Sequence, residues 1–305
     1  MRILLTISGG IDSMYLATRA GELFPGAEFA VAHCNFNLRG TESDGDCAFV
    51  KDWCAHHSIP FFSKIFDTSG YAAVKGVSIE MAARELRYEW FGELCRTEGF
   101  DAIAVAHNAN DNAETLMLNL LRGTGTRGIR GMSSSSITGE MTVLRPLLGT
   151  TRKEIERWMT ANGQTWREDR TNAESEYKRN KLRNLAFPVF EDINPSFVKT
   201  LGEDMQRFRM VDDIAEDYFL ENVAAVFDGE AIDTRKLLQL KHWEYVLWRI
   251  LEHCSFSYET FGKMTALLEK YKNEPSGTVT LGGKRFESPT HIVRAVRKKL
   301  LISER

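Results

Sequence analysis

Six residues near the start of the chain combine glycines with hydroxyl and carboxylate side chains. Ser8-Gly9-Gly10-Ile11-Asp12-Ser13 follows the apolar run 3–7 and precedes a segment with helical spacing, so we expect a strand, a glycine loop and a helix. Adjacent glycines let the backbone approach a bound group closely, and a helix N-terminus directs free N–H groups and positive dipole at it. The loop therefore predicts an anion site.

Asp12 gives this loop a second feature. A carboxylate is badly placed to hold phosphate directly but can hold a metal that bridges phosphates, and Ser8 and Ser13 add hydroxyl donors. The residue order excludes a Walker loop and does not support a dinucleotide fold. Two interpretations stay open from the residues alone: a site for nucleotide phosphates with Mg²⁺, or a strand-to-helix turn capped by Ser or Asp.

Composition bounds the class of protein. The chain has 305 residues, of which 43% are hydrophobic and 27% charged, enough for two globular domains. The net charge of −3 argues against indiscriminate nucleic-acid binding but not against a local basic face. The five cysteines contain no C-x-x-C pair, so neither a disulfide framework nor a zinc ribbon is indicated. Without a signal segment or an apolar run of membrane-spanning length, we expect a cytoplasmic protein with no membrane partner.

Residues 1 to about 150 alternate short apolar runs with helix-periodic stretches, and we expect the domain that they build to extend to residue 190. This pattern predicts an α/β fold, a parallel-sheet nucleotide-binding domain with helices on both faces. We expect strands near 2–7, 28–33, 61–66, 101–106 and 142–146, helices near 12–21, 42–57, 77–98 and 109–122, and an exposed loop tip at 133–136. Residues 195–305 predict a smaller, mainly helical domain with a terminal β hairpin. Ligands of such sheets bind at the carboxyl ends of the strands.

Polar side chains gather where those strands end. His33, Asn35 and Arg39 follow the second strand, in a loop that could equally be a capped turn with a satisfied histidine. Arg84 and Arg87 are spaced i, i+3 and project from one helix face, where they could meet phosphate or form a solvated charged face.

The fourth strand is followed by His107 and then by two carboxylates. Asp111 and Glu114 are spaced i, i+3 at a helix N-terminus, so both face the strand ends. Such a pair can hold Mg²⁺ or a substrate ammonium group, or can simply cap the helix.

Two basic stretches lie further along the chain. Arg122 stands in a glycine-rich segment, and Lys178, Arg179 and Arg183 follow Tyr177, which can stack on a base. Such stretches suit RNA phosphates, while a flexible connector and a solvated helix face are the alternatives.

Several of these motifs resemble known families. Ser-Gly-Gly-x-Asp-Ser resembles the loop of the N-type ATP pyrophosphatases, and the string from His33 to Asp46 closely resembles the signature of the bacterial tRNA(Ile)-lysidine synthetases. Further resemblances to that family lie at 84–88, 107–115, 166–172 and 177–184, with Asn110 standing where the family has an acid. The resemblance covers residues 2 to about 185 and weakens after that.

The resemblance implies an ATP- and Mg²⁺-dependent ligase. Its substrates would be ATP, free L-lysine and an isoleucine tRNA with a wobble cytidine. The C2 oxygen of that cytidine would be adenylated with release of pyrophosphate, and lysine would then attack C2 and expel AMP, giving lysidine. The residues 195–305 would have a possible tRNA-contact role, and we expect little room there for the further C-terminal domain that family members commonly carry. The sequence does not define the oligomeric state.

The resemblance also implies roles for individual residues. We expect the catalytic residues to be Asp12, Arg87, Asp111, Glu114 and Arg179, with Asp12 and Asp111 as metal ligands. We expect nucleotide contacts from Ile7, Ser8, Gly9, Gly10, Asp12, Ser13, His33, Asn35, Arg84 and His107. We assign tRNA contacts to Arg39, Arg122, Lys178 and Arg183.

The sequence leaves three alternative functions open. A tRNA thiolase would share the phosphate loop but usually carries paired cysteines, which this chain lacks. A small-molecule adenylating amide ligase fits the loop but leaves the 33–46 string unexplained. A non-catalytic ATP-sensing RNA-binding module would bind ATP without turnover, so that AMP production separates it from the enzymes.

Overall fold

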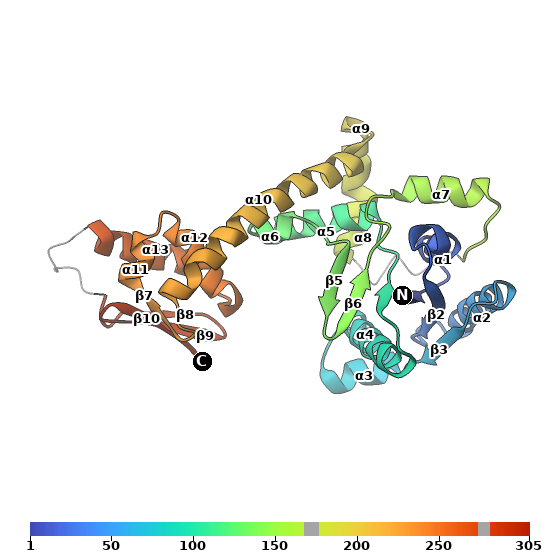
Figure 1. The fold of residues 1–305 in the computed structure, drawn as a ribbon, viewed down its shortest axis with the longest axis horizontal. Helices are drawn as coiled ribbons and strands as arrows, with labels where there is room; N and C mark the ends of the chain where they lie inside the picture. Colours follow the sequence, from blue (N-terminus) through green and yellow to red (C-terminus); the bar gives the residue numbers. More distant parts are fainter. Residues whose placement is uncertain (168–176, 274–280) are drawn as a thin grey trace. The chain divides into compact units, whose positions relative to one another are not determined.

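The computed structural model describes residues 1–167, 177–273 and 281–305, drawn in Figure 1. These residues form two compact units, Met1–Arg209 and Met210–Arg305, and the boundary falls within the long helix α10 (Phe197–Val226). The expected motif at 166–172 lies largely outside the described residues, as does the start of the expected hairpin at 277–280.

The first unit is built on a six-stranded sheet with the order β3-β2-β1-β4-β6-β5. All neighbouring strands pair in parallel except the edge strand β5, which pairs antiparallel with β6. The strands are β1 (Arg2–Thr6), β2 (Glu28–Asn35), β3 (Phe61–Ile65), β4 (Ala102–Ala104), β5 (Ser135–Thr138) and β6 (Met141–Leu144). The expected α/β fold with a parallel-dominated sheet is confirmed, but the expectation of a loop over 133–136 is wrong for its last two residues, which begin β5.

Helices cover both faces of this sheet because its central strand is apolar on both. In β1, Ile3 and Leu5 pack in one hydrophobic cluster with α1, α2 and α7, and Leu4 between them packs in another cluster with α4. This alternation follows from the two-residue period of a strand. The helices are α1 (Ile11–Leu23), α2 (Thr41–His56), α3 (Thr68–Lys75), α4 (Ile79–Glu98), α5 (Ala109–Arg122), α6 (Thr126–Ile129) and α7 (Arg152–Ala161).

A separate cluster joins α5 to the helical segments that follow residue 176. Ala109 and Ala113 of α5 pack with Leu182, Phe187 and Phe197. The segments involved are α8 (Tyr177–Lys181), a single π-helical stretch η1 (Leu182–Ala186), α9 (Phe187–Ile193) and the start of α10. This cluster carries the basic residues of 178–183 to the side of the acid-bearing helix α5.

The second unit has its own core and an antiparallel sheet of order β7-β10-β9-β8. Its elements after α10 are β7 (Ala231–Asp233), α11 (Thr234–Gln239), α12 (Trp243–Leu251), η2 (Glu252–Cys254), α13 (Tyr258–Asn273), β8 (Arg285–Glu287), β9 (His291–Val296) and β10 (Lys299–Glu304). Helices and a terminal hairpin are present as expected, but the hairpin is formed by β9 and β10, over a stretch where the sequence predicts a single final strand at 292–302 after a hairpin at 277–286. Among the described residues, none of the helices combines the length and the apolar character that crossing a bilayer requires.

Candidate functional site

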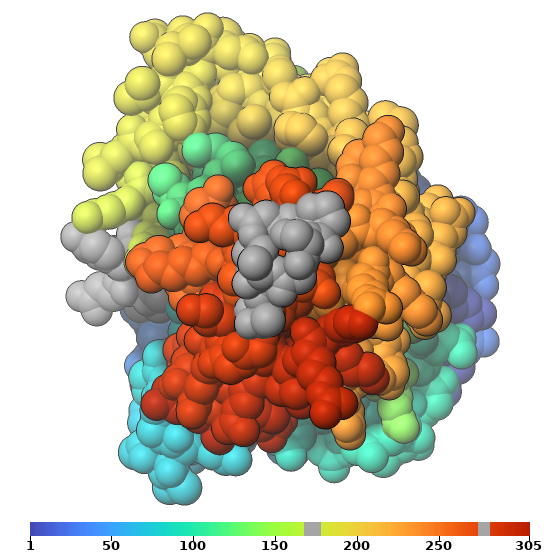
Figure 2. Space-filling model, turned by 90° about the vertical axis from the view of Figure 1, so that its left-hand side faces the viewer, coloured from blue at the N-terminus to red at the C-terminus, as the bar shows by residue number. Residues whose placement is uncertain are grey.

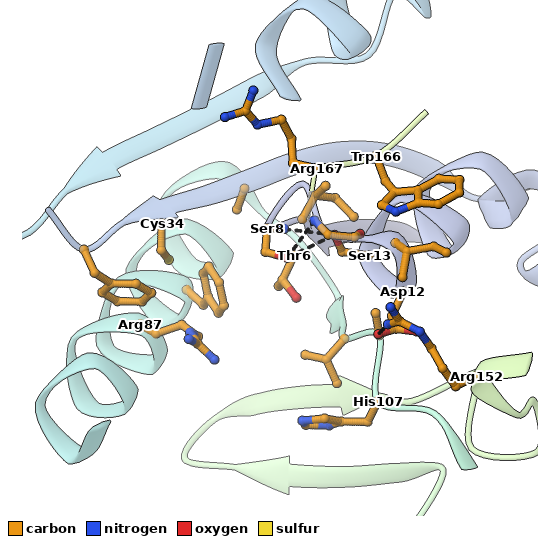
Figure 3. A pocket seen from close by; sticks show the side chains of 18 of the residues that line it. Thr6, Ser8, Asp12, Ser13, Cys34, Arg87, His107, Arg152, Trp166 and Arg167 are labelled. Atoms are coloured by element: carbon orange, nitrogen blue, oxygen red, sulfur yellow. Dashed lines mark hydrogen bonds and ion pairs between the residues drawn. The ribbon is translucent and has the colours of Figure 1, made fainter. Parts of the chain in front are cut away.

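The sheet of the first unit has a switch point between β1 and β4. From β1 the chain continues to β2 and β3 on one side, whereas β4 and β6 lie on the other side. At such a point the loops after the two central strands diverge and leave a crevice for a ligand. A cavity of about 800 Å³ lies there, lined by residues that follow β1, β2 and β4 (Figure 3). The expected nucleotide-site residues that line it are Ile7, Ser8, Gly10, Asp12, Ser13, Arg84 and His107, together with the expected catalytic Arg87.

The glycine loop is held in shape by its own serines. The Ser13 hydroxyl accepts hydrogen bonds from the backbone N–H groups of Ser8 (3.2 Å) and Gly9 (3.1 Å) and donates to the carbonyl of Gly10 (2.8 Å). Gly9 has a φ of +95°, which side-chain-bearing residues rarely adopt, so glycine is required there. Ser13 therefore fixes the turn that opens α1, and Gly9 is buried and is not among the residues that line the cavity.

His33 and Asn35 lie behind the loop rather than in the cavity lining. Nδ1 of the buried His33 donates to the carbonyl of Ile7 (2.8 Å), and burial lowers the pKa of this imidazole, which keeps it neutral. Asn35 donates to Asp44 (2.9 Å) and accepts from the N–H of Asn37 (2.9 Å). Both side chains brace the backbone that carries the site.

Asp46 links the loop after β2 to the glycine loop. One of its oxygens accepts from Arg39 (2.9 Å) and the other from Nε of Arg167 (2.8 Å), while the backbone N–H of Arg167 donates to the carbonyl of Gly9 (2.9 Å). Arg39, expected to contact tRNA, thus lies in an ion pair inside this network.

Asp12 points into the cavity from the first turn of α1 and is held by two partners. Nη1 of Arg152 lies 2.5 Å from its Oδ2, and Nδ2 of Asn108 donates to its Oδ1 (3.1 Å). Burial raises the pKa of the Asp12 carboxyl; the guanidinium of Arg152 lowers it, and the charge of Asp111 raises it further. The expected metal ligands Asp12 and Asp111 are therefore close enough to affect each other.

Asn108 connects this site to the second pair of carboxylates. Its Oδ1 caps α5 by accepting from the N–H groups of Asn110 (2.9 Å) and Asp111 (3.1 Å), and Asp111 completes a capping box by accepting from the N–H of Asn108 (3.0 Å). Asp111 thus serves as a cap, one of the alternatives that the sequence leaves open, and is also near Asp12.

Glu114 lies one turn further along α5 and its side chain is fully buried. Nε of Arg183 donates to its Oε1 (2.8 Å), Nη1 of Arg179 is 3.9 Å from its Oε2, and Nη2 of Arg183 is 3.7 Å from Asp111. Burial raises the pKa of the Glu114 carboxyl, and Arg183 opposes that shift. Arg183, expected to contact tRNA, therefore lies at the acid pair together with Arg179.

The opposite wall of the cavity comes from α4 and β4. The guanidinium carbon of Arg87 lies 5.1 Å from the centre of the Phe36 ring, and that of Arg84 lies 5.0 Å from the Tyr88 ring. Burial lowers the pKa of His107 to about 4, and its buried Nδ1 has no hydrogen-bond partner among the described residues. This wall offers two cations and a neutral imidazole to a ligand.

Of the remaining expected tRNA contacts, Arg122 and Lys178 are exposed on the last turn of α5 and on α8. Sequence reasoning missed two arginines of the cavity, Arg152 and Arg167. Arg152 follows Thr151, whose capping box with Glu154 marks the start of α7, but nothing in the local sequence links it to Asp12.

Comparison with known proteins identifies the family. Residues 1–190 match the PP-loop domain, and residues 228–305 match the TilS substrate binding domain. A tRNA(Ile)-lysidine synthase of Petrotoga mobilis is 37% identical over 247 residues, which cover 76% of this chain and 77% of that protein. The chain belongs to the tRNA(Ile)-lysidine synthase family.

Other relatives in the tRNA(Ile)-lysidine synthase family are longer than this chain. The synthase of Parabacteroides distasonis is 36% identical over 99% of this chain and 65% of its own length. That of Porphyromonas gingivalis is 42% identical over 78% of this chain and 48% of its own length. The chain thus spans about half to two thirds of these relatives.

A solved structure shares the fold. A U34-tRNA thiolase from Methanococcus maripaludis superposes with a TM-score of 0.57 over 68% of this chain and 71% of its own, at 18% identity. At that identity the likeness shows the PP-loop fold alone.

Proposed function

We propose that this chain joins lysine to C2 of the wobble cytidine of an isoleucine tRNA, converting ATP to AMP and pyrophosphate through an adenylated cytidine. The observation that carries the proposal is Asn108, whose amide holds Asp12 of the glycine loop and whose oxygen caps the helix bearing Asp111 and Glu114. A phosphate site and an amine site are thereby joined by one side chain. We expect the enzyme to act in the cytoplasm, where its tRNA substrate is found.

The first step requires stabilisation of the leaving pyrophosphate. The N-terminus of α1 and the arginines Arg84 and Arg87 line one cavity, so charge that develops on the phosphates meets fixed dipoles and cations. Mg²⁺ is commonly bound by one or two carboxylates together with substrate phosphates. Asn108 donates hydrogen bonds to both Asp12 and Asp111, and we propose that these two carboxylates would hold the ion. Bound there, the ion would neutralise phosphate charge.

The second step requires an uncharged lysine ε-amine, which attacks C2 and expels AMP. The amine ordinarily has a pKa of about 10.4, so a proton must be removed. Glu114 suits this task because burial raises the pKa of its carboxyl, which makes it a stronger base than an exposed glutamate. We propose that Asp111 and Glu114 orient the lysine, while Arg87 and Arg179 offset phosphate charge.

Recognition of tRNA requires basic surface outside the cavity. Arg122 and Lys178 are exposed in the first unit, and we propose that both contact RNA phosphates. In the second unit, whose terminal strands are red in Figure 2, exposed basic residues follow one another along β8, β9 and the β9–β10 turn. They are Lys284, Arg285, Arg294, Arg297, Lys298 and Lys299. We propose that this surface contributes to tRNA binding.

Release of AMP and pyrophosphate tests the proposal against its alternatives. Reactions with ATP, Mg²⁺ and a tRNA carrying a wobble cytidine should form AMP, and sustained formation should require lysine. ATP binding without AMP would support the ATP-sensing module instead. AMP formed with no tRNA present would favour a small-molecule ligase.

A further inference from the structure

A cationic side chain outside all the expected motifs lies at the glycine loop. Arg152 is the first residue of α7, more than a hundred positions away from the loop in sequence, yet its Nη1 lies 2.5 Å from Oδ2 of Asp12. Figure 3 shows Arg152 and Arg87 on opposite sides of Thr6, the last residue of β1, and Ser8 of the glycine loop. The cavity therefore has cations at both ends.

The guanidinium of Arg152 is held by two hydrogen bonds and keeps further N–H donors for a ligand. Nη1 donates to Asp12 and Nε donates to Glu156 (2.8 Å), whereas Nη2 makes no hydrogen bond to any described residue. The side chain lines the cavity and is 41% exposed. A guanidinium carries five N–H donors in a planar fork that matches phosphate oxygens, so donors remain for a ligand.

The backbone of Arg152 is fixed by Asn110, which stands where the family has an acid. The Asn110 side-chain oxygen accepts from the N–H of Arg152 (3.0 Å) and so ties the start of α7 to the start of α5. An aspartate can accept the same bond through a carboxylate oxygen, because both side chains carry an oxygen at that position. The exchange of Asp for Asn therefore preserves the tether.

The negative charge of Asp12 favours a cationic side chain in this place. Asp12 puts a negative charge at the N-terminus of α1, where the terminal phosphates of ATP are expected, and like charges there would repel. Of the charged residues that line the cavity, Arg152 is the one ion-paired with Asp12. It offsets the carboxylate and adds donors directed at the same space.

We propose that Arg152 binds the terminal phosphates of ATP and the pyrophosphate product, and that Asn110 is the positioning residue that holds it there. This inference rests on the proposed ATP chemistry and deepens it. It assigns the pyrophosphate end of the nucleotide to the side of the cavity formed by α7.

Binding of ATP, pyrophosphate and AMP by titration calorimetry tests the assignment, with and without Mg²⁺. In Arg152→Ala, affinity for ATP and pyrophosphate should fall about 10- to 100-fold, as expected for loss of a charge-assisted contact, while AMP affinity changes less than about threefold. Arg157→Ala removes an equal charge from an exposed position of the same helix and should bind all three ligands as the unaltered chain does. If Arg152→Ala fails to fold, Arg152→Gln replaces it.

A merely structural role for Arg152 predicts different results. If the arginine only neutralises Asp12, then adding Arg152→Ala to the Asp12→Asn variant should leave its ATP affinity unchanged. On our account, the double variant should bind ATP more weakly than Asp12→Asn alone. Asn110→Asp should stay within about threefold of the unaltered chain, whereas Asn110→Leu should weaken ATP and pyrophosphate binding about tenfold and spare AMP. Equal pyrophosphate affinity in Arg152→Ala and Arg157→Ala would overturn the assignment, while lysine transfer by the unaltered chain would still support the proposed function.

Discussion

Two carboxylates in the first unit are each held by an arginine from a later helix, yet their surroundings differ. Asp12 keeps 28% of its side chain exposed, faces the cavity and pairs with Arg152, whose own side chain is 41% exposed. Glu114 has no exposed side-chain surface and is approached by both Arg179 and Arg183. The open carboxylate suits binding of a metal that also contacts phosphates, and the closed one suits proton transfer, where desolvation raises basicity.

The largest expected effect is on the closed site. Glu114→Ala and Asp111→Ala should each reduce lysine transfer by at least about 100-fold, because a positioned base contributes about 10² to 10⁴ in rate. Steady-state kinetics with lysine as the varied substrate measures this effect. An unchanged lysine KM and kcat in both variants would contradict the role of the acid pair.

Arg183 and Lys178 sharpen the comparison because they lie five positions apart in adjoining helical segments. Arg183 contacts the acid pair, so Arg183→Ala should alter lysine kinetics more than tRNA affinity. Lys178→Ala, from the exposed surface, should weaken tRNA binding modestly and reduce the slope of log K against log salt by about one. Measurements of tRNA affinity across a salt series distinguish these two roles. The reverse pattern would mean that Arg183 contacts tRNA and that Lys178 does not.

The neutral imidazole of His107 predicts a pH dependence of stability. Burial lowers its pKa from 6.5 to about 4, so the unfolded chain binds the proton more readily than the folded one between these values. This contribution to stability is complete above about pH 6.5 and is lost as the pH falls toward 4. Urea unfolding measured between pH 7.5 and pH 5 should therefore show that the free energy of unfolding falls more steeply with decreasing pH in the unaltered chain than in His107→Asn. Parallel curves would mean that His107 does not titrate in this way.

The smallest effect is expected at the cap of α7. Thr151 accepts from the N–H of Glu154 in a capping box, so Thr151→Ala should lower the free energy of unfolding by about 1 kcal/mol. Because α7 carries Arg152 and not Glu114, the ATP KM should rise while the lysine KM stays constant. A change in the lysine KM that exceeds the change in the ATP KM would show that the sites at Asp12 and Glu114 are not independent.

How far the sequence predicts the site depends on the distance between partners along the chain. The glycine loop could be inferred because Ser13 bonds to residues four and five positions away. The pair of Arg152 and Asp12 spans 140 positions, and that of Arg183 and Glu114 spans 69, so no spacing rule reveals either. Arg183 was interpreted as an RNA contact because it belongs to a basic run, and only the packing of η1 beside α5 brings it to the acids.

The fold shows a different limit, which lies in local composition. Apolar strands alternating with helices predict the parallel sheet, because buried strands are apolar on both faces. The edge strand β5 was not predicted, since its serines favour loops. It is stabilised by pairing with β6 and by Arg145, which donates to the Ser133 carbonyl (3.1 Å) and the Ser136 hydroxyl (2.9 Å). These partners lie only three to twelve positions away along the chain, so the serine-rich composition of β5, and not the distance to its partners, concealed the strand.

Transfer of labelled lysine to tRNA tests the proposed function most directly. The chain would be incubated with ATP, Mg²⁺, radiolabelled lysine and an isoleucine tRNA transcript with cytidine at the wobble position, beside a matched transcript with uridine there. Our account predicts acid-precipitable label in the cytidine transcript alone, accompanied by AMP and pyrophosphate. Equal label in both transcripts, or pyrophosphate release without label, would contradict it.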